Sequence, residues 1–258
     1  MAAQHGVRDQ QIEKDYVLSW ILQGISRHEA LRQIIAFKGG TLLKKIYFED
    51  YRFSEDLDFT LLDDSITNEQ IFEWFEQVFG YIQAESNIPL VIVDNHEHQD
   101  GGINFYITYV GPLGGSGAHK RIKIDIARSE TLVFEPVYRE ALLSYSDQTA
   151  HKLLCYSLEE VLIEKLRSVM QRMQARDFYD LWYLLKIRGM DAQFLMAEFE
   201  SKCNAKGLGP EDFPAKLEQR LPQYRARWEQ SLREQIPGLP DFGRVEREMR
   251  RQLKKLGS

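Results

Sequence analysis

The sequence contains few cysteines and no long apolar run. Of its 258 residues, only Cys155 and Cys203 are cysteines, and they lie far apart, outside any metal-binding or redox spacing. We therefore expect two reduced, buried thiols in a cytoplasmic protein. No stretch of eighteen apolar residues is present, which predicts that the chain does not span a membrane. The N-terminal stretch MAAQHGVRDQ also lacks the apolar segment of a signal peptide.

An excess of positive charge is missing as well, since the formal net charge is −6. Such a value does not indicate a nucleic-acid-binding protein. The charges are unevenly distributed, however, because residues 216–258 hold eleven lysine and arginine residues against six acidic ones. The terminal stretch RVEREMRRQLKKLGS could therefore contact phosphates, although the solvated face of a helix explains the same pattern.

The apolar residues, 43% of the chain, are sufficient for a folded core, and their pattern predicts an α+β fold followed by helices. Helical periodicity marks residues 9–28 and 68–85, whereas residues 31–37 fit either a helix or a strand. Strand-like alternation or apolar runs mark residues 56–62, 89–94, 103–110 and 121–128, and the Gly-rich residues 111–120 predict a hairpin loop. We expect an α+β domain with a small mixed sheet at residues 1–135 and an all-helical domain at residues 136–258.

Boundaries of the later helices are also encoded in the sequence. Ser157 and Glu160 form the pattern of a capping box at the start of a helix. Gly189 is placed to end the following helix, residues 176–188. Further along, Pro222 predicts an interruption of the helical pattern.

The segment DLDFTLL places two carboxylates on one face of a strand. Because side chains alternate along a strand, Asp56 and Asp58 point to the side opposite Leu57 and Phe59. Two carboxylates so close repel each other unless water or a cation compensates them. Mg²⁺ prefers oxygen ligands and keeps waters or phosphates in its shell, so the pair is a plausible platform for Mg²⁺ or Mn²⁺. Taken alone, the D-x-D pattern is weak.

A third carboxylate and a glycine turn strengthen this interpretation. In RIKIDIAR, Asp125 lies on the polar face of its strand, so the three aspartates can converge if the two strands are neighbours. Three carboxylates are the parts needed for two-metal phosphoryl or nucleotidyl transfer. The turn at Gly39, Gly40 and Thr41 opens a short helix whose free N–H groups, with the Thr41 hydroxyl, are suited to hold phosphate oxygens.

Lys165 lies in the apolar stripe of its predicted helix, because Val161 and Val169 are spaced from it by four residues. A lysine there either extends to the surface or meets an anion. Arg176 and Asp180, four residues apart on the next helix, are explained simply by a surface ion pair. Arg52 could counter the charge of the aspartates or contact phosphate, and the sequence does not decide between these roles.

Several of these stretches together resemble a known family. FKGGTLLKK followed by RFSEDLDFTLL resembles the signature of the DNA polymerase β-like nucleotidyltransferase superfamily, and more specifically of the AbiEii/AbiGii toxin family. EKDYVLSWIL resembles the first helix of that family, LEEVLIEKLRSVMQR its lysine motif, and ARDFYDLWYLL its R-D-x-x-D motif. The similarity spans about residues 10–190. It implies a polymerase β-like nucleotidyltransferase domain followed by a helical domain.

The resemblance also implies roles for single residues. Gly40 and Thr41 match the pair that grips the nucleotide phosphates, although Gly39 could equally be the first glycine of that pair. Asp56 and Asp58 match the metal-binding aspartates, and Asp125 looks like the third carboxylate and general base. Lys165 matches the lysine expected to contact the triphosphate. Of the last motif, which Arg176, Asp177 and Asp180 match, Arg176 is expected to help bind the nucleotide and Asp177 is the likelier functional aspartate.

The implied activity is an NTP-dependent, Mg²⁺-requiring nucleotidyltransferase that releases pyrophosphate. The family further implies the toxin of a bacterial toxin–antitoxin or abortive-infection pair, with a cognate antitoxin protein and a tRNA or other RNA acceptor. Two alternatives stay open at this point. One is a module that binds a nucleotide or a partner without turnover, and the other is a transferase that modifies a small molecule such as an antibiotic.

Overall fold

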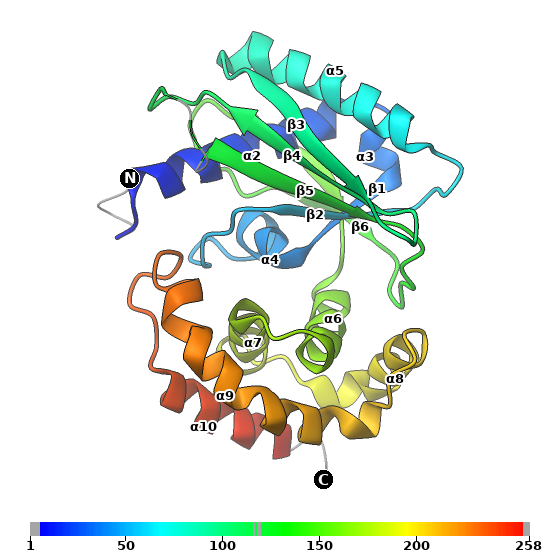
Figure 1. The fold of residues 1–258 in the computed structure, drawn as a ribbon, viewed down its shortest axis with the longest axis vertical. Coiled ribbons are helices and arrows are strands. Elements are labelled where there is room, and N and C mark those ends of the chain that lie inside the picture. Colours follow the sequence, from blue (N-terminus) through cyan, green and yellow to red (C-terminus); the bar gives the residue numbers. More distant parts are fainter. Residues whose placement is uncertain (1–5, 116, 118–119, 255–258) are drawn as a thin grey trace. The chain divides into compact units, whose positions relative to one another are not determined.

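The computed structural model describes residues 6–115, 117 and 120–254. The chain divides into two compact units (Figure 1): unit 1 comprises Met1–Glu130 and Pro136–Tyr156, and unit 2 comprises Thr131–Glu135 and Ser157–Ser258. This division differs from the expected ranges, 1–135 and 136–258, because the segment after residue 135 adds two strands to the sheet of unit 1. Parts of the expected hairpin loop and of the basic C-terminal stretch lie outside the described residues.

Unit 1 is built on a seven-stranded mixed sheet with the order β3-β4-β5-β2-β1-β7-β6. The strands are β1 (Ile35–Lys38), β2 (Leu57–Leu61), β3 (Leu90–Glu97), β4 (Ile103–Tyr109), β5 (Arg121–Ala127), β6 (Val137–Glu140) and β7 (Lys152–Cys155). The pairs β2–β5 and β1–β7 are parallel, and the remaining neighbours are antiparallel. The expected α+β class and its mixed sheet are thereby confirmed.

Four of the strands were expected from alternation, and the hairpin between β4 and β5 is formed. The ambiguous segment 31–37 divides into a short helix, α3 (Leu31–Ile34), and β1. Sequence patterns missed β6 and β7. Each has only four residues, and all four of β6 are exposed, so no apolar alternation marks that edge strand.

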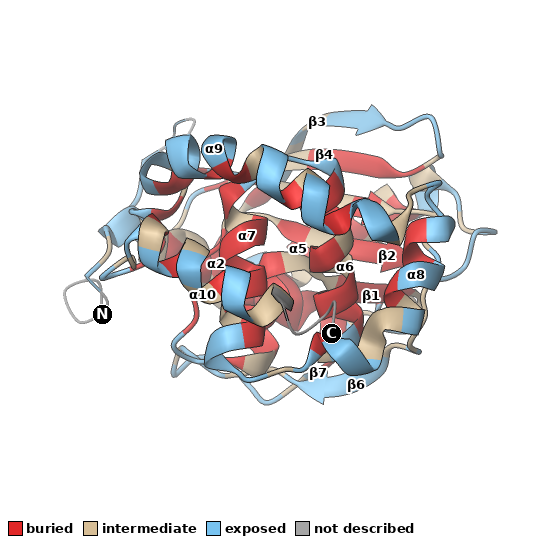
Figure 2. Cartoon of the chain, turned by 90° about the horizontal axis from the view of Figure 1, so that it is seen from below, coloured by how far each residue is buried: buried red, intermediate tan, exposed pale blue. Residues whose placement is uncertain are grey.

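Two long helices of unit 1, α2 (Asp9–Arg27) and α5 (Asn68–Ser86), contact each other and cover the apolar face of the sheet (Figures 1 and 2). That face presents Phe59 and Phe105, both fully buried. The helices approach closely at Gly24, where an added Cβ would lie 2.8 Å from Cγ1 of Val78. The start of α5 is fixed by a capping box between Thr67 and Gln70.

The described elements of unit 2 are helices and helical turns. They are α6 (Leu158–Gln171), α7 (Ala175–Trp182), η3 (Tyr183–Ile187), η4 (Ala192–Leu195), α8 (Met196–Asn204), η5 (Pro210–Asp212), α9 (Phe213–Leu232) and α10 (Phe242–Lys254). An aromatic cluster joins α7, α9 and α10, in which Phe178 stacks on Tyr224 with ring centroids 5.1 Å apart and Trp228 packs against Phe242. This cluster supplies much of the buried core of the unit.

Two expectations about helix boundaries need correction. Pro222 lies inside α9 without ending it, because Leu221 and Tyr224 on either side are buried and packing outweighs the missing hydrogen bond. Ser157 caps α6 through the N–H of Glu160, but the Glu160 carboxylate does not complete a capping box. It accepts instead from the N–H groups of Val133 and Phe134, and it pairs with Lys202. Gly189, at φ 68°, follows η3 as expected.

Both cysteines, Cys155 in β7 and Cys203 in α8, are free thiols and fully buried, as expected. Burial raises the pKa of both thiols, so they are poor nucleophiles. Among the described residues, no helix is long and apolar enough to cross a membrane.

Candidate active site

Two of the three aspartates expected to converge, Asp58 and Asp125, lie side by side on the polar face of the unit 1 sheet. Strands β2 and β5 are parallel neighbours, and Asp58 is the direct register partner of Asp125. Residues directly opposite each other in a sheet point to the same side. The same row continues to Lys38 on β1 and to Asn104 on β4. Asp58 and Asp125 are only partly buried, so both carboxylates are accessible from one face.

Asp56 immediately precedes β2, and Thr41 determines the path of the backbone there. The Thr41 hydroxyl donates to the backbone carbonyl of Asp56 at 2.5 Å, and the threonine side chain is buried. This hydrogen bond joins the glycine turn to the first aspartate. Thr41 therefore positions the backbone at Asp56, and its expected grip on nucleotide phosphates stays a prediction.

Both glycines of the turn lie against charged side chains. Gly39 adopts φ 81°, a conformation that favours glycine, and an added Cβ would lie 2.2 Å from Oδ2 of Asp58. At Gly40, an added Cβ would lie 2.3 Å from an Nη atom of Arg52. The turn thus packs its bare backbone against an aspartate on one side and a buried guanidinium on the other. This arrangement places Arg52 at the first turn of α4 (Gly39–Leu42).

Lys123 is a site residue that the sequence reading missed. Its Nζ atom lies 2.5 Å from Oδ2 of Asp125. Burial acts to lower the pKa of Lys123, but the Asp125 carboxylate and then Asp58 outweigh it and raise that pKa. The signal was present in RIKIDIAR, where Lys123 and Asp125 are two residues apart and hence share a face of the strand.

The donor set suits a cation that arrives with phosphates. Among the described residues, no three His, Cys, Asp or Glu side chains gather into a group able to hold a metal alone. Asp58 and Asp125 nevertheless offer carboxylate oxygens from adjacent register positions, and one oxygen of Asp125 faces Lys123. Mg²⁺ is usually held by one or two carboxylates, with waters and substrate phosphates completing its shell. The residues therefore fit a magnesium–nucleotide complex better than a permanent metal cage.

In unit 2, Lys165 lies at the centre of a buried ion cluster. Its Nζ atom is 2.7 Å from Oδ1 of Asp177 and 2.7 Å from Oδ2 of Asp180, and all three side chains are almost fully buried. The half-exposed Arg172 approaches the other oxygen of Asp177, at 2.6 Å from its Nε atom. Of the two alternatives for Lys165, the structure shows contact with anions, which are carboxylates of α7; its expected contact with a triphosphate stays a prediction.

The expected surface ion pair between Arg176 and Asp180 is wrong. Asp180 is fully buried and pairs with Lys165, because α7 turns this side chain toward α6 rather than toward solvent. Asp177 is held ionised by its neighbours. Burial alone would raise the pKa of Asp177, but Lys165 and Arg172 together lower it below the ordinary value.

The charged residues of the stretch EKDYVLSWIL form three ion pairs within unit 1. Glu13 pairs with Lys120 at 2.8 Å, Lys14 pairs with Glu55 at 3.3 Å, and Asp15 pairs with Lys45 at 2.6 Å. The Glu13 and Asp15 pairs are buried. Through Lys45, which lies in the π-helical turn η1 (Leu43–Tyr47), α2 holds the helix that follows the glycine turn.

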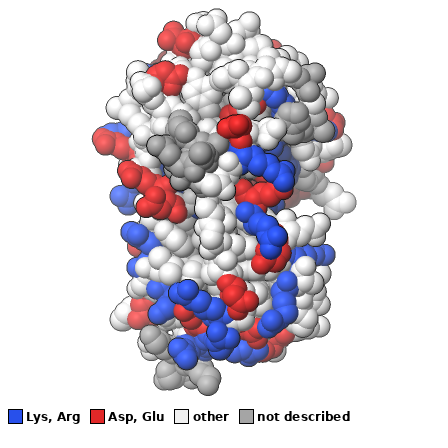
Figure 3. Space-filling model, turned by 90° about the vertical axis from the view of Figure 1, so that its left-hand side faces the viewer, with Lys and Arg blue, Asp and Glu red and all other residues white. Residues whose placement is uncertain are grey.

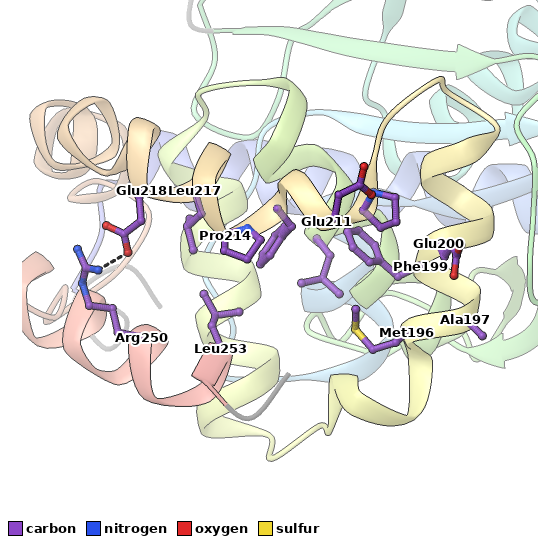
Figure 4. A pocket seen from close by; sticks show the side chains of 13 residues that line it. Met196, Ala197, Phe199, Glu200, Glu211, Pro214, Leu217, Glu218, Arg250 and Leu253 are labelled. Carbon is purple, nitrogen blue, oxygen red and sulfur yellow. Dashed lines mark hydrogen bonds and ion pairs between the residues drawn. The ribbon is translucent and has the colours of Figure 1, made fainter. Parts of the chain in front are cut away.

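Unit 2 also contains a cavity apart from the ion cluster of Lys165 (Figure 4). It measures about 860 Å³ and is mainly apolar, with Phe199, Phe213 and Leu217 in its wall and an ion pair between Arg250 and Glu218 at its rim. Lys165, Asp177 and Asp180 are not among its lining residues. The cavity is therefore not lined by the residues of unit 2 that the sequence predicted to be functional.

Two solved structures resemble the chain over nearly its whole length. JHP933 from Helicobacter pylori is 17% identical with a TM-score of 0.61, and the match covers 97% of this chain and 95% of that one. An H. pylori protein described as a candidate nucleotidyltransferase is also 17% identical with a TM-score of 0.61, covering 97% and 98%. At this identity the likeness shows the fold alone. No curated protein matches the chain significantly.

A mixed sheet of this fold, with paired aspartates beside a glycine turn, defines the nucleotidyltransferase class. A family model narrows the assignment, because the nucleotidyl transferase AbiEii toxin of type IV toxin–antitoxin systems matches residues 20–253. The chain belongs to this family. The resemblance seen in the motifs from Phe37 to Leu62 and from Leu158 to Leu185 is thereby confirmed.

Proposed function

We propose that this protein transfers a nucleoside monophosphate from an NTP to a hydroxyl group of an RNA acceptor and releases pyrophosphate. The observation that carries the proposal is the register of Asp58 and Asp125 on adjacent parallel strands, with Asp56 and the glycine turn beside them. Membership of the AbiEii family supports the transfer reaction and a toxin role opposed by a cognate antitoxin.

In this proposal, Asp58 and Asp125, with Asp56 beside them, would hold Mg²⁺ or Mn²⁺ together with the substrate phosphates, and the metal would supply charge neutralisation at the triphosphate and activation of the acceptor hydroxyl. Asp125 accepts the proton of that hydroxyl as its oxygen forms a bond to the α-phosphorus. The bond from the α-phosphorus to the bridging oxygen breaks, and pyrophosphate leaves with the electron pair. Lys123 supports this role because its ammonium contacts one oxygen of Asp125 and holds the orientation of that carboxylate.

The phosphates of the NTP are assigned to the glycine turn. The backbone of Gly39 and Gly40, at the start of α4, lies beside the cation of Arg52 in unit 1. Such a combination of backbone donors and guanidinium suits phosphate oxygens. For Lys165 and Arg176, the family resemblance proposes contacts with the nucleotide, and for Asp177 a catalytic role. The ion pairs of unit 2 support a defined orientation of Lys165 and Asp177.

A labelling experiment tests the proposal. The protein is incubated with each α-³²P-labelled NTP, Mg²⁺ and mixed tRNA, and label in RNA is quantified. We expect the wild type to label RNA and Asp58→Asn to be at least about a thousandfold slower, because removing a metal ligand sacrifices several kcal/mol of transition-state stabilisation. Asp64→Asn, in an exposed turn, is the matched control and should retain full activity.

Label in RNA with equal rates for wild type and Asp58→Asn would contradict the assigned site. Tight nucleotide binding without pyrophosphate release, with every acceptor supplied, would favour a binding module. Transfer to an aminoglycoside but not to tRNA would favour the small-molecule transferase.

A further inference from the structure

A basic hollow lies in unit 1, separate from the aspartates. It measures about 680 Å³ and is formed by the end of α2, by α3 and by the strands β6 and β7. Arg27, Arg32, Lys152 and His151 contribute to its wall, and no acidic residue does. Glu140 reaches Lys152 only at 3.6 Å, between two well-exposed side chains. The hollow thus concentrates positive charge on a unit that is otherwise rich in carboxylates.

Polar groups in the hollow are left for a ligand. None of the hydrogen bonds or ion pairs between described residues involves the Arg32 side chain, and that side chain is exposed. The Nδ1 atom of His151 contacts the carbonyl of Thr149 at 2.8 Å, while its buried Nε2 atom has no hydrogen-bond partner in the described part of the chain. Tyr138 is 53% exposed, so its ring is available for stacking.

The hollow lies at the β6 edge of the sheet that carries the aspartates, and two of its lining residues, Tyr138 and Leu154, share the aspartates' face of that sheet. Phe37 and Cys155 are register partners on the apolar face, so Leu154 and its partner Tyr138 point to the opposite, polar face, as do Lys38 and Asp58. Strand β6 lies three positions from β2 in the sheet order. At a spacing of about 4.8 Å per strand, the hollow is roughly 14 Å across the sheet from the aspartates.

We propose that this hollow, lined by Arg27, Arg32, Lys152 and Tyr138, binds the backbone phosphates of the RNA acceptor while its reacting hydroxyl lies at the aspartates. This inference rests on the proposed function. Arginine and lysine neutralise phosphates, and an exposed aromatic ring stacks on an unpaired base. A single nucleotide cannot occupy both places, whereas a polynucleotide repeats its phosphate along the chain and spans the distance.

The C-terminal helices are less suited to this task. In α9 and α10, Arg225, Arg244 and Arg250 are paired with glutamates of the same two helices. Figure 3 shows basic and acidic side chains interspersed over unit 2. Of the arginines in α10, Arg247 and Arg251 are exposed and take part in no ion pair between described residues. They provide a matched comparison with the hollow.

The test measures tRNA binding by two double variants with the same loss of charge. Arg32→Gln/Lys152→Gln changes the hollow, and Arg247→Gln/Arg251→Gln changes α10. Fluorophore-labelled mixed tRNA is titrated by anisotropy at several salt concentrations, without NTP. We expect the hollow variant to bind about tenfold more weakly, with a salt slope reduced by about 1.5, as the loss of two phosphate contacts requires. The α10 variant should bind as the wild type does.

The inference is overturned if the hollow variant binds tRNA with the affinity and salt slope of the wild type, or if the wild type binds no tRNA. Thermal unfolding and a titration with Mn²⁺ and NTP serve as controls, and both should be unchanged in the two variants. Because nucleotide binding at Asp56 and Asp58 is measured independently, a failed RNA result leaves the nucleotide part of the proposed function standing. A lost Mn²⁺–NTP signal in the wild type would contradict that function itself.

Discussion

The two units hold their carboxylates in opposite ways. On the sheet of unit 1, Asp58 and Asp125 are partly exposed, side by side, and partly compensated by Lys123. In unit 2, Asp177 and Asp180 are buried and directly bonded to Lys165. A partly exposed pair of carboxylates can accept a cation, whereas buried carboxylates in ion pairs can only be removed at a large cost in stability. The comparison predicts that the unit 1 pair is open to a cation and that the unit 2 cluster is needed for stability, whatever further role its residues have.

The largest effect is expected from Lys165→Met. This change leaves the buried Asp180 without its cation, and removal of one partner from a buried pair lowers the free energy of unfolding by about 3–5 kcal/mol. Urea unfolding followed by circular dichroism measures the change. Lys186→Met, at an exposed position of η3, is the control and should alter stability by less than about 0.5 kcal/mol. Equal stability of the two variants would mean that the cluster is not structural.

Gly39→Ala should have the next largest effect. The substitution combines a positive φ with a collision against Asp58, and we expect a loss of about 1–3 kcal/mol in unfolding free energy, accompanied by weaker Mn²⁺–NTP binding. Gly80→Ala is a control for which we expect a higher, not a lower, free energy of unfolding. Gly80 is exposed in α5 with nothing within 4 Å of an added Cβ, so the alanine should stabilise by about 0.5–1 kcal/mol. A neutral Gly39→Ala would show that the turn does not contact Asp58.

Lys123→Met tests whether Lys123 competes with a metal ion for the Asp125 carboxylate. Without Lys123, both oxygens of Asp125 are available, and we expect Mn²⁺ alone to bind about fivefold more tightly, as the loss of one competing ion pair of about 1 kcal/mol implies. Electron paramagnetic resonance of free Mn²⁺ gives the affinity. Arg121→Met, on the same strand as Lys123, removes a cation that pairs with Asp94 of β3 and should leave the affinity unchanged. If Lys123→Met bound Mn²⁺ more weakly than the wild type does, the assignment of Asp125 as a metal ligand would be wrong.

The smallest expected effect is on the dependence of folding stability on pH. Because the folded pKa of Asp177 is lowered by Lys165 and Arg172, its carboxylate stabilises the fold above the ordinary aspartate pKa of about 3.9, and this contribution disappears as the pH falls through the folded value. Asp177→Asn should therefore be less stable than wild type at pH 7. The difference should shrink below about pH 4. A difference that is constant from pH 7 to pH 3 would contradict the proposed ion pairing.

Strand alternation alone predicted that Asp56, Asp58 and Asp125 lie on polar faces, because a period of two fixes the side of each residue. It could not predict that Asp58 and Asp125 are register partners. Their strands are parallel and separated by a helix and a hairpin, so only tertiary packing defines the register. The same limitation hid β6 and β7, which join the sheet through pairing with β1 rather than through a pattern of their own.

In unit 2, the position of Lys165 on an apolar stripe predicted either an extension to the surface or an anionic partner. The partners themselves, twelve and fifteen residues further along, depend on how α7 packs against α6, which the helical period does not specify. The buried pair of Asp15 and Lys45 was missed for the same reason. Composition identifies a charged residue in an apolar setting, but the fold decides which charge it meets.

The most direct test of the central claim is calorimetric titration of a non-hydrolysable NTP analogue in the presence of Mn²⁺. The wild type should bind the analogue only when Mn²⁺ is present, and Asp58→Asn should lose binding by at least about tenfold while its thermal stability is unchanged, since each metal-binding carboxylate contributes to holding the cation. Asp64→Asn should behave as the wild type does. Undiminished, Mn²⁺-dependent binding by Asp58→Asn would contradict the assignment of the unit 1 aspartates as the nucleotide-binding site.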